Sequence, residues 1–117
     1  MSFLGHTHTP QLTAAEAVAM LRDGALLLDV RELDEWNAGH APEATHIPMG
    51  ELGAQIGRVD PAQPIIIICR SGRRSDHAAA ALRNAGYDAY NFSGGMQAWQ
   101  FSGGDVVAAE GSSGTVI

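Results

Sequence analysis

The chain has 117 residues, of which 45% are hydrophobic and 6% aromatic, a balance that favours one globular domain over a disordered chain. No apolar run approaches the roughly 20 residues of a membrane-spanning helix, and the first ten residues lack the basic and apolar regions of a signal peptide. The net charge is −6 and all seven basic residues are arginines, which argues against nucleic acid or an anionic membrane as a partner. A single cysteine excludes an intramolecular disulfide, so we expect a reducing compartment, the cytoplasm.

The first predicted element is a helix. The sequence "TAAE" matches a helix capping box with Thr13 as N-cap and Glu16 three residues later, and Gly24 is well placed to end that helix. The apolar run at 25–30 then predicts a short strand that is covered on both faces.

The middle of the chain predicts shorter elements. We expect a short helix at 32–37, a brief strand near 44–47 and a weak helical turn at 50–57. The four consecutive isoleucines at 65–68 predict a strand more strongly than any other segment, because β-branched residues favour strands.

The last predicted elements again alternate between helix and strand. Residues 75–85 predict an alanine-rich helix that ends at Gly86, residues 88–92 a further strand, and residues 93–99 a turn into a short helix. Strands that alternate with helices indicate an α/β fold with a mainly parallel sheet. Ligands of such sheets bind at the carboxyl ends of the strands, where Cys69 lies.

We expect three segments along the chain. Residues 1–9 read as a loose N-terminal segment, residues 10–104 as the folded domain, and residues 105–117, rich in glycine and serine, as a flexible tail.

The segment "CRSGRRS" connects the isoleucine strand to the next helix and carries the chemistry. Gly72 permits a positive φ, so that successive backbone N–H groups can turn toward one centre. The start of the next helix adds unpaired N–H groups and partial positive charge. This field favours an anion and lowers the pKa of Cys69, which makes the thiolate a poised nucleophile. The alternative, a free cysteine that is simply a small buried hydrophobic residue, is the usual one outside such a loop.

These residues resemble the active-site loop of single-domain rhodanese (thiosulfate sulfurtransferase) proteins. The likeness extends upstream to "LLDVRELDEWNAGHAPEATHIP", residues 27–48, and downstream to "GGMQAW", residues 94–99. It covers roughly residues 10–102, with three motifs in the family's order. His40 departs from the pattern, since Ala41 and Glu43 replace the isoleucine and glycine that usually follow the Gly-His pair.

The resemblance implies a rhodanese-like three-layer fold with a five-stranded, mainly parallel sheet flanked by helices. It also implies that Cys69 takes a sulfane sulfur from thiosulfate or another persulfide donor and passes it to cyanide or a thiol, with no cofactor or metal. The partners are then a small anionic donor, a thiol or cyanide acceptor, and a sulfur-relay protein. The backbone and side chains of the following residues are expected to bind the donor and cradle the persulfide: Arg70, Ser71, Gly72, Arg73, Arg74 and Ser75.

Three further residues are expected to support the loops, namely Asp29, Arg31 and Glu35. Asp29 and Arg31 follow a buried strand, and we interpret them as residues that form ion pairs and fix the loops around the cleft, rather than as residues that act at the active edge. Arg70 and Arg73 are the candidates for attracting an anionic donor, whereas Arg74 more readily pairs with an acid such as Glu35 or Asp29.

Other functions stay open at this point. The nearest rival chemistry is that of cysteine phosphatases and arsenate reductases. The phosphatases use Cys-x5-Arg, but the residue six positions after Cys69 is Ser75, and a shorter loop suits sulfur better than phosphate. A redox role lacks a second cysteine, and the histidines show no metal-ligand spacing. A sulfur-carrying or protein-binding module without fast turnover is the main alternative to an enzyme.

Overall fold

A computed structural model describes residues 9–117 of the chain. A five-stranded sheet forms its centre, with every neighbouring pair of strands parallel and the order β1-β5-β4-β2-β3. The strands are β1 (Gln11–Leu12), β2 (Leu26–Asp29), β3 (Thr45–His46), β4 (Ile65–Ile68) and β5 (Ala89–Phe92). This is the five-stranded parallel α/β sheet that the family resemblance implies.

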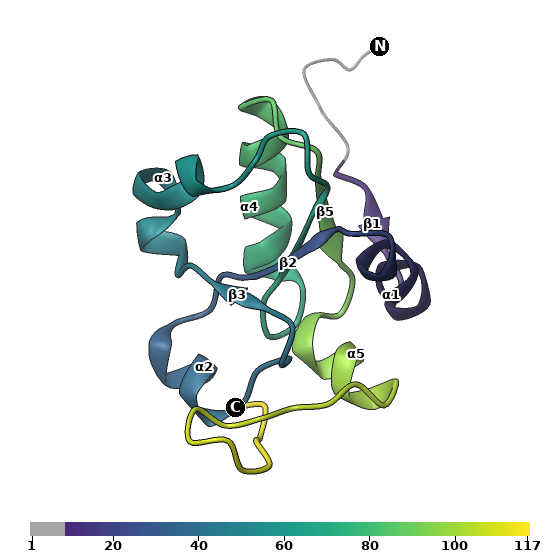
Figure 1. The fold of residues 1–117 in the computed structure, drawn as a ribbon, viewed down its shortest axis with the longest axis vertical. Helices are drawn as coiled ribbons and strands as arrows, with labels where there is room; N and C mark the ends of the chain where they lie inside the picture. Colours follow the sequence, from purple (N-terminus) through teal and green to yellow (C-terminus); the bar gives the residue numbers. More distant parts are fainter. Residues whose placement is uncertain (1–8) are drawn as a thin grey trace.

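Helices cover both faces of the sheet and complete the three layers (Figure 1). The α-helices are α1 (Ala14–Arg22), α2 (Leu33–Ala38), α3 (Leu52–Gln55), α4 (Arg73–Asn84) and α5 (Gly95–Phe101), and short 3-10 turns, η1 (Met49–Glu51) and η2 (Ile56–Arg58), flank α3. One apolar cluster joins the sheet to α3 and α4, and a second joins it to α1 and α5. Across residues 9–117, none of these helices has the length and apolar character needed to cross a membrane.

The central strand β4 contributes side chains to both apolar clusters. Ile65 and Ile67 belong to the cluster under α4, and Ile66 and Ile68 belong to the cluster under α1 and α5. Because side chains alternate between the faces of a strand, the residue after Ile68 faces α4 again. Cys69 is accordingly a member of the α4 cluster, so the four isoleucines determine the face on which the thiol lies.

The predicted elements are all observed, with bounds within two residues of those expected. The capping box of Thr13 and Glu16 is formed at the start of α1, and β4 has the predicted bounds. The helix predicted from residue 75 begins two residues earlier, at Arg73. The strand β1 was not predicted, because two residues are too few to show a pattern and their partner β5 lies 80 positions away in sequence.

The C-terminal segment 105–117 folds back onto the end of α2 (Figure 1). Val107 forms an antiparallel bridge with His40, and the backbone N–H groups of Ala109 and Thr115 donate to the carbonyls of Asn37 and Ala38. Helix C-termini leave such carbonyls without partners inside the helix. The composition predicts a flexible tail, but composition carries no information about backbone contacts such as these. The expected loose segment 1–9, with His6 and His8, lies outside the described residues apart from its last residue.

Hydrogen exchange can measure how firmly this segment is held. We expect slow exchange for the amides of Val107, Ala109 and Thr115, whose backbone bonds join them to α2 and the residues after it. Glu110 and Ser112, at the turn of the segment, serve as fast-exchanging internal controls. Equally fast exchange at all five amides would support the flexible tail instead.

Candidate functional site

Cys69 lies at the carboxyl end of β4 beneath the first turn of α4. Only 1% of its surface is exposed, and two donors lie within hydrogen-bond distance of its Sγ. They are the Gly72 backbone N–H at 3.1 Å and the Ser75 hydroxyl at 3.2 Å. Gly72 has a φ of 100°, the left-handed conformation predicted from the sequence, and this turn directs its N–H toward the sulfur.

Two opposing effects act on the pKa of Cys69. Burial is the largest single effect and raises the pKa, since it disfavours the charged thiolate. The hydrogen bonds of the Ser75 hydroxyl and of the Ser75, Gly72 and Ser71 backbone N–H groups lower it, and together they outweigh burial. The pKa of Cys69 is therefore below that of an ordinary thiol, as expected for a nucleophile.

The loop is held from the other side by α5. The Met96 N–H donates to the Cys69 carbonyl at 2.7 Å, and the Gln97 N–H donates to the Arg70 carbonyl at 3.1 Å. In a trans peptide the carbonyl and the next N–H point in opposite directions. With both carbonyls turned toward α5, the N–H groups of Arg70 and Ser71 must point away from α5.

Gly95 makes this approach possible. A Cβ added at Gly95 would lie 2.5 Å from the Cys69 carbonyl oxygen and 2.6 Å from that of Arg70, and its φ is 59°. Any side chain there would push α5 away from the loop. The "GGMQAW" motif therefore does more than form a tight turn, because it lets two backbone segments touch.

Arg74 pairs with Glu35, the structural alternative considered from the sequence. Its Nη1 and Nη2 each donate to one carboxylate oxygen of Glu35 at 2.7 Å, a bidentate bridge between α4 and α2. The hydrogen bond from Arg74 lowers the pKa of Glu35, and the bond to Glu35 raises the pKa of Arg74. The positive charge of Arg74 is thus largely neutralised by Glu35.

Asp29 and Arg31 form a fully buried ion pair at the end of β2. Arg31 Nη2 lies 2.8 Å from the Asp29 carboxylate and also donates to the Gly39 carbonyl at 2.7 Å. A pair of this kind fixes local geometry, because breaking it would leave an uncompensated buried charge. It links β2 to the end of α2, which carries Glu35.

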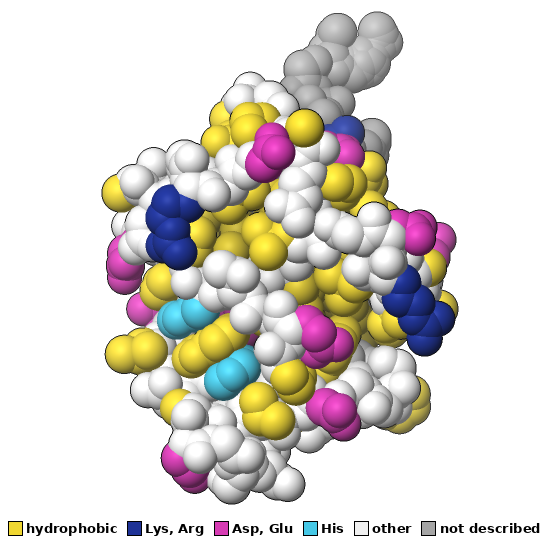
Figure 2. Space-filling view, in the orientation of Figure 1, with side chains coloured by type: hydrophobic (Ala, Val, Ile, Leu, Met, Phe, Trp, Pro, Cys, Tyr) yellow, Lys and Arg dark blue, Asp and Glu magenta, His cyan; other side chains and the backbone are white. Residues whose placement is uncertain are grey.

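Arg70 and Arg73 differ from the other two arginines of the site. Both are exposed, and within residues 9–117 neither side chain has a hydrogen bond or ion pair. Positive charge without an acidic partner among the described residues is therefore available beside the loop. On the face drawn in Figure 2, arginine side chains lie apart from one another and acidic ones are scattered between them.

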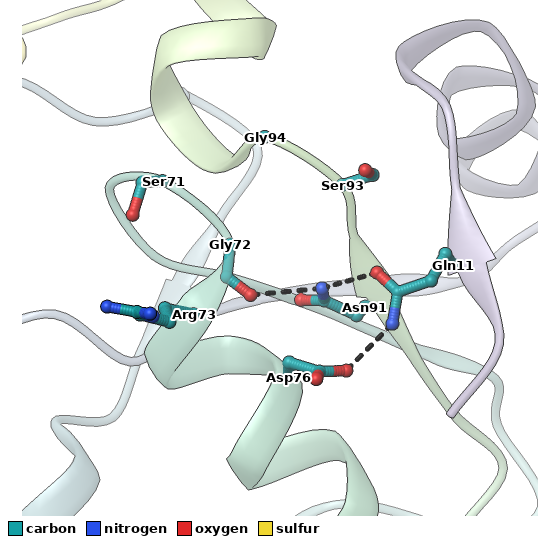
Figure 3. A pocket seen from close by; sticks show the side chains of 8 residues that line it. All are labelled: Gln11, Ser71, Gly72, Arg73, Asp76, Asn91, Ser93 and Gly94. Atoms are coloured by element: carbon teal, nitrogen blue, oxygen red, sulfur yellow. Dashed lines mark hydrogen bonds between the residues drawn. The ribbon is translucent and has the colours of Figure 1, made fainter. Parts of the chain in front are cut away.

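A polar hollow of about 430 Å³ lies next to the loop (Figure 3). Residues from the ends of β1 and β5 and from the start of α4 line it: Gln11, Ser71, Gly72, Arg73, Asp76, Asn91, Ser93 and Gly94. In the described part of the chain, histidines, cysteines and acids form no group of three that could hold a metal ion.

Sequence reasoning missed Asn91, which is buried on β5. Its side chain contacts Ser75, Gly72 and Gln11. An isolated asparagine within a strand pattern was the one available signal, since asparagine is depleted in strands.

Comparison with known proteins finds relatives in sequence and in fold. The family described as "Rhodanese-like domain" matches residues 13–102. "Thiosulfate sulfurtransferase GlpE" of Pseudomonas savastanoi pv. phaseolicola is 30% identical over 95 residues, which are 80% of this chain and 90% of that protein. "Putative sulfur carrier protein YrkF" of Bacillus subtilis is 39% identical over 74 residues, which are 62% of this chain but 40% of that protein. The crystal structure of a rhodanese-related protein from Thermoplasma volcanium superposes with a TM-score of 0.77 at 28% identity, covering 84% of this chain and 97% of that one.

The contact of Gly95 with the loop gives a direct test. We expect Gly95→Ala to displace α5 and loosen the loop, so that Cys69 reacts more slowly with iodoacetamide near neutral pH and the free energy of unfolding falls by more than about 1 kcal/mol. Alkylation rates followed by mass spectrometry, together with urea unfolding, measure both effects.

Gly103→Ala is the matched control. Gly103 has a φ of 94° just beyond the other end of α5, but a Cβ there meets nothing within 4 Å. It reproduces the backbone strain without the clash. Equal reactivity of Cys69 in the two variants would show that the α5 contact does not hold the loop.

Proposed function

The chain belongs to the rhodanese-like family, and from this premise we propose that it is a sulfurtransferase that moves a sulfane sulfur through a persulfide of Cys69. The observation that carries the proposal is the environment of the thiol. A buried sulfur that accepts hydrogen bonds from a backbone N–H and a hydroxyl, with its pKa lowered, suits a nucleophile that needs no separate general base.

The first half-reaction loads the enzyme. The Cys69 thiolate attacks the outer sulfur of a donor such as thiosulfate, a new S–S bond forms, and the S–S bond within the donor breaks. Sulfite leaves with the bonding electron pair as its dianion, and the outer sulfur of the persulfide keeps the negative charge that it carried in thiosulfate. The loop N–H groups from Arg70 to Ser75 are suited to hold that charge, because donors arranged in advance stabilise an anion without reorganisation.

The second half-reaction releases the sulfur. A cyanide ion or a thiolate attacks the outer sulfur, the S–S bond of the persulfide breaks, and Cys69 returns as the thiolate. The two steps share one site, so the kinetics should be of the double-displacement form. A cysteine that must stay reduced to accept sulfur suits the cytoplasm.

Four arginines at the site divide into two roles. Arg70 and Arg73 are exposed and have no acidic partner within residues 9–117, which supports them as the residues that attract an anionic donor. Arg74 and Arg31 are held by Glu35 and Asp29 and maintain the loops.

A sulfur carrier is the second candidate. Part of the chain matches a protein described as a putative sulfur carrier, and the same persulfide serves a carrier that passes sulfur to a relay protein. Steady turnover with thiosulfate and cyanide separates the two, because a carrier alone gives a single loading without rapid release.

Persulfide formation is the primary test. We expect incubation with thiosulfate to add the mass of one sulfur atom to the intact protein, with the label removed by cyanide and by a thiol reductant. Cys69→Ser should abolish the label, because a hydroxyl is not ionised at neutral pH. Sulfur transfer that persists in Cys69→Ser would overturn the mechanism.

The donor role of Arg70 has its own test. We expect Arg70→Ala to raise the KM for thiosulfate by about two- to fivefold with little change in thermal stability, the size typical of an exposed charge interaction. The effect should shrink as salt is added. Arg22→Ala, which removes another exposed arginine, from α1, is the control. Identical KM values for the two variants would remove Arg70 from donor binding.

A further inference from the structure

Four polar or charged residues are buried among the described residues, and two of them adjoin the thiol. Asp29 and Arg31 neutralise each other, whereas Ser75 and Asn91 form a hydrogen-bonded chain that ends at Cys69. Asn91 is 2% exposed and comes from β5, outside the loop. Its position beside Ser75 suggests a role in the chemistry of the sulfur.

The side-chain amide of Asn91 has one orientation. Its Nδ2 donates to Gln11 Oε1 at 2.7 Å and to the Gly72 carbonyl at 3.1 Å, as Figure 3 shows. These acceptors use both protons of the amide nitrogen. Its Oδ1 is therefore the atom that faces Ser75, with 2.6 Å between Oδ1 and the Ser75 Oγ.

The Ser75 hydroxyl has one proton and two acceptors. One is Asn91 Oδ1 at 2.6 Å and the other is Cys69 Sγ at 3.2 Å. A hydroxyl donates one hydrogen bond at a time. Whichever acceptor is not chosen stays without that bond inside the protein, which is unfavourable for a buried polar atom.

We propose that Asn91 is a positioning residue whose Oδ1 competes with Cys69 Sγ for the one hydrogen bond that the Ser75 hydroxyl can donate. The hydroxyl is then a switch with two positions. With a neutral thiol, the S–H donates to Ser75 Oγ and the hydroxyl donates to Asn91, so every group is satisfied. With the thiolate, the hydroxyl turns to the sulfur, and Asn91 Oδ1 loses its donor.

The switch favours the loaded state over the thiolate, a point that rests on the proposed sulfurtransferase reaction. In the persulfide the inner sulfur is neutral and the charge lies on the outer sulfur. The hydroxyl is then free to return to Asn91, while the loop N–H groups hold the outer sulfur. Asn91 thereby keeps the free thiolate higher in energy, and more reactive, than the loop alone would.

The other charged groups near the sulfur are the same in the thiolate and in the persulfide. Arg74 on α4 interacts with the Cys69 charge and is paired with Glu35 on α2. At the end of β2, Asp29 and Arg31 neutralise each other. Asp76 on α4 is reached from Asn91 only through Gln11.

The pH dependence of Cys69 alkylation by iodoacetamide reads the thiolate without any sulfur donor. We expect Asn91→Leu, which removes the competing acceptor at similar volume, to shift the rate profile to lower pH. On the acidic limb the thiolate fraction should rise by about three- to tenfold, the size of one ordinary net hydrogen bond. The alkylation rate there should rise by about two- to fourfold, since lower nucleophilicity offsets part of that gain. The plateau rate should fall, because a less basic thiolate is a weaker nucleophile.

Two controls separate the switch from loosened packing. Gln11→Ala removes one partner of the Asn91 amide but leaves Oδ1 facing Ser75, and its profile should match the unmodified protein. Ser75→Ala should shift the profile to higher pH. In that background Asn91→Leu should have no further effect, since no hydroxyl is left to compete for.

A measurement on the unmodified protein covers the case in which Asn91→Leu fails to fold. The ¹³C shift of the Asn91 side-chain carbonyl should titrate with the same midpoint as Cys69 alkylation, and in thiosulfate-loaded protein it should match the low-pH form. A carbonyl shift that is constant through this range would overturn the proposal. So would an Asn91→Leu profile that is unshifted, moved to higher pH, or equally shifted without Ser75. Absence of sulfur transfer with these alkylation results intact would count against the proposed function alone.

Discussion

Two backbone hydrogen bonds, from Met96 and Gln97 at the start of α5 to the carbonyls of Cys69 and Arg70, hold the loop on which the site depends. They turn the two loop carbonyls toward α5, so the N–H groups of Arg70 and Ser71 face away from it. Glycine at position 95 is required because any Cβ would separate the two segments. The thiol would otherwise be a buried group in a flexible turn, with burial raising its pKa and few donors to offset that effect.

The Cys69 thiolate is stabilised more by hydrogen-bond dipoles than by formal charges. The guanidinium of Arg74, whose charge interacts with Cys69, is bonded at two points to Glu35, whereas the donors to Cys69 are backbone N–H groups and a hydroxyl. Buried dipoles are screened by salt far less than exposed charges. The thiolate is therefore stabilised independently of the exposed arginines, which remain available for attraction of an anion to an otherwise acidic molecule.

The sequence predicted those features that depend on local pattern. Four isoleucines indicated β4, and the position of Cys69 after them indicated the edge of the sheet at which the thiol lies. The glycine at 72 and the helix that follows predicted the turn of the loop. Asn91, by contrast, meets Ser75 only because β5 lies beside β4, and a strand of two residues such as β1 has no pattern to detect. Contacts made by sheet order and by backbone, including those of the C-terminal segment, leave little trace in composition.

The order of assembly has a consequence for the cell that makes this chain. The amides that hold the loop belong to residues 96 and 97, which leave the ribosome after Cys69 has already emerged. Until α5 docks, the loop carbonyls have no fixed partners and the thiol keeps the low reactivity of an ordinary cysteine. In the nascent chain Cys69 thus has the reactivity of an ordinary cysteine, and its enhanced nucleophilicity develops when the fold is complete.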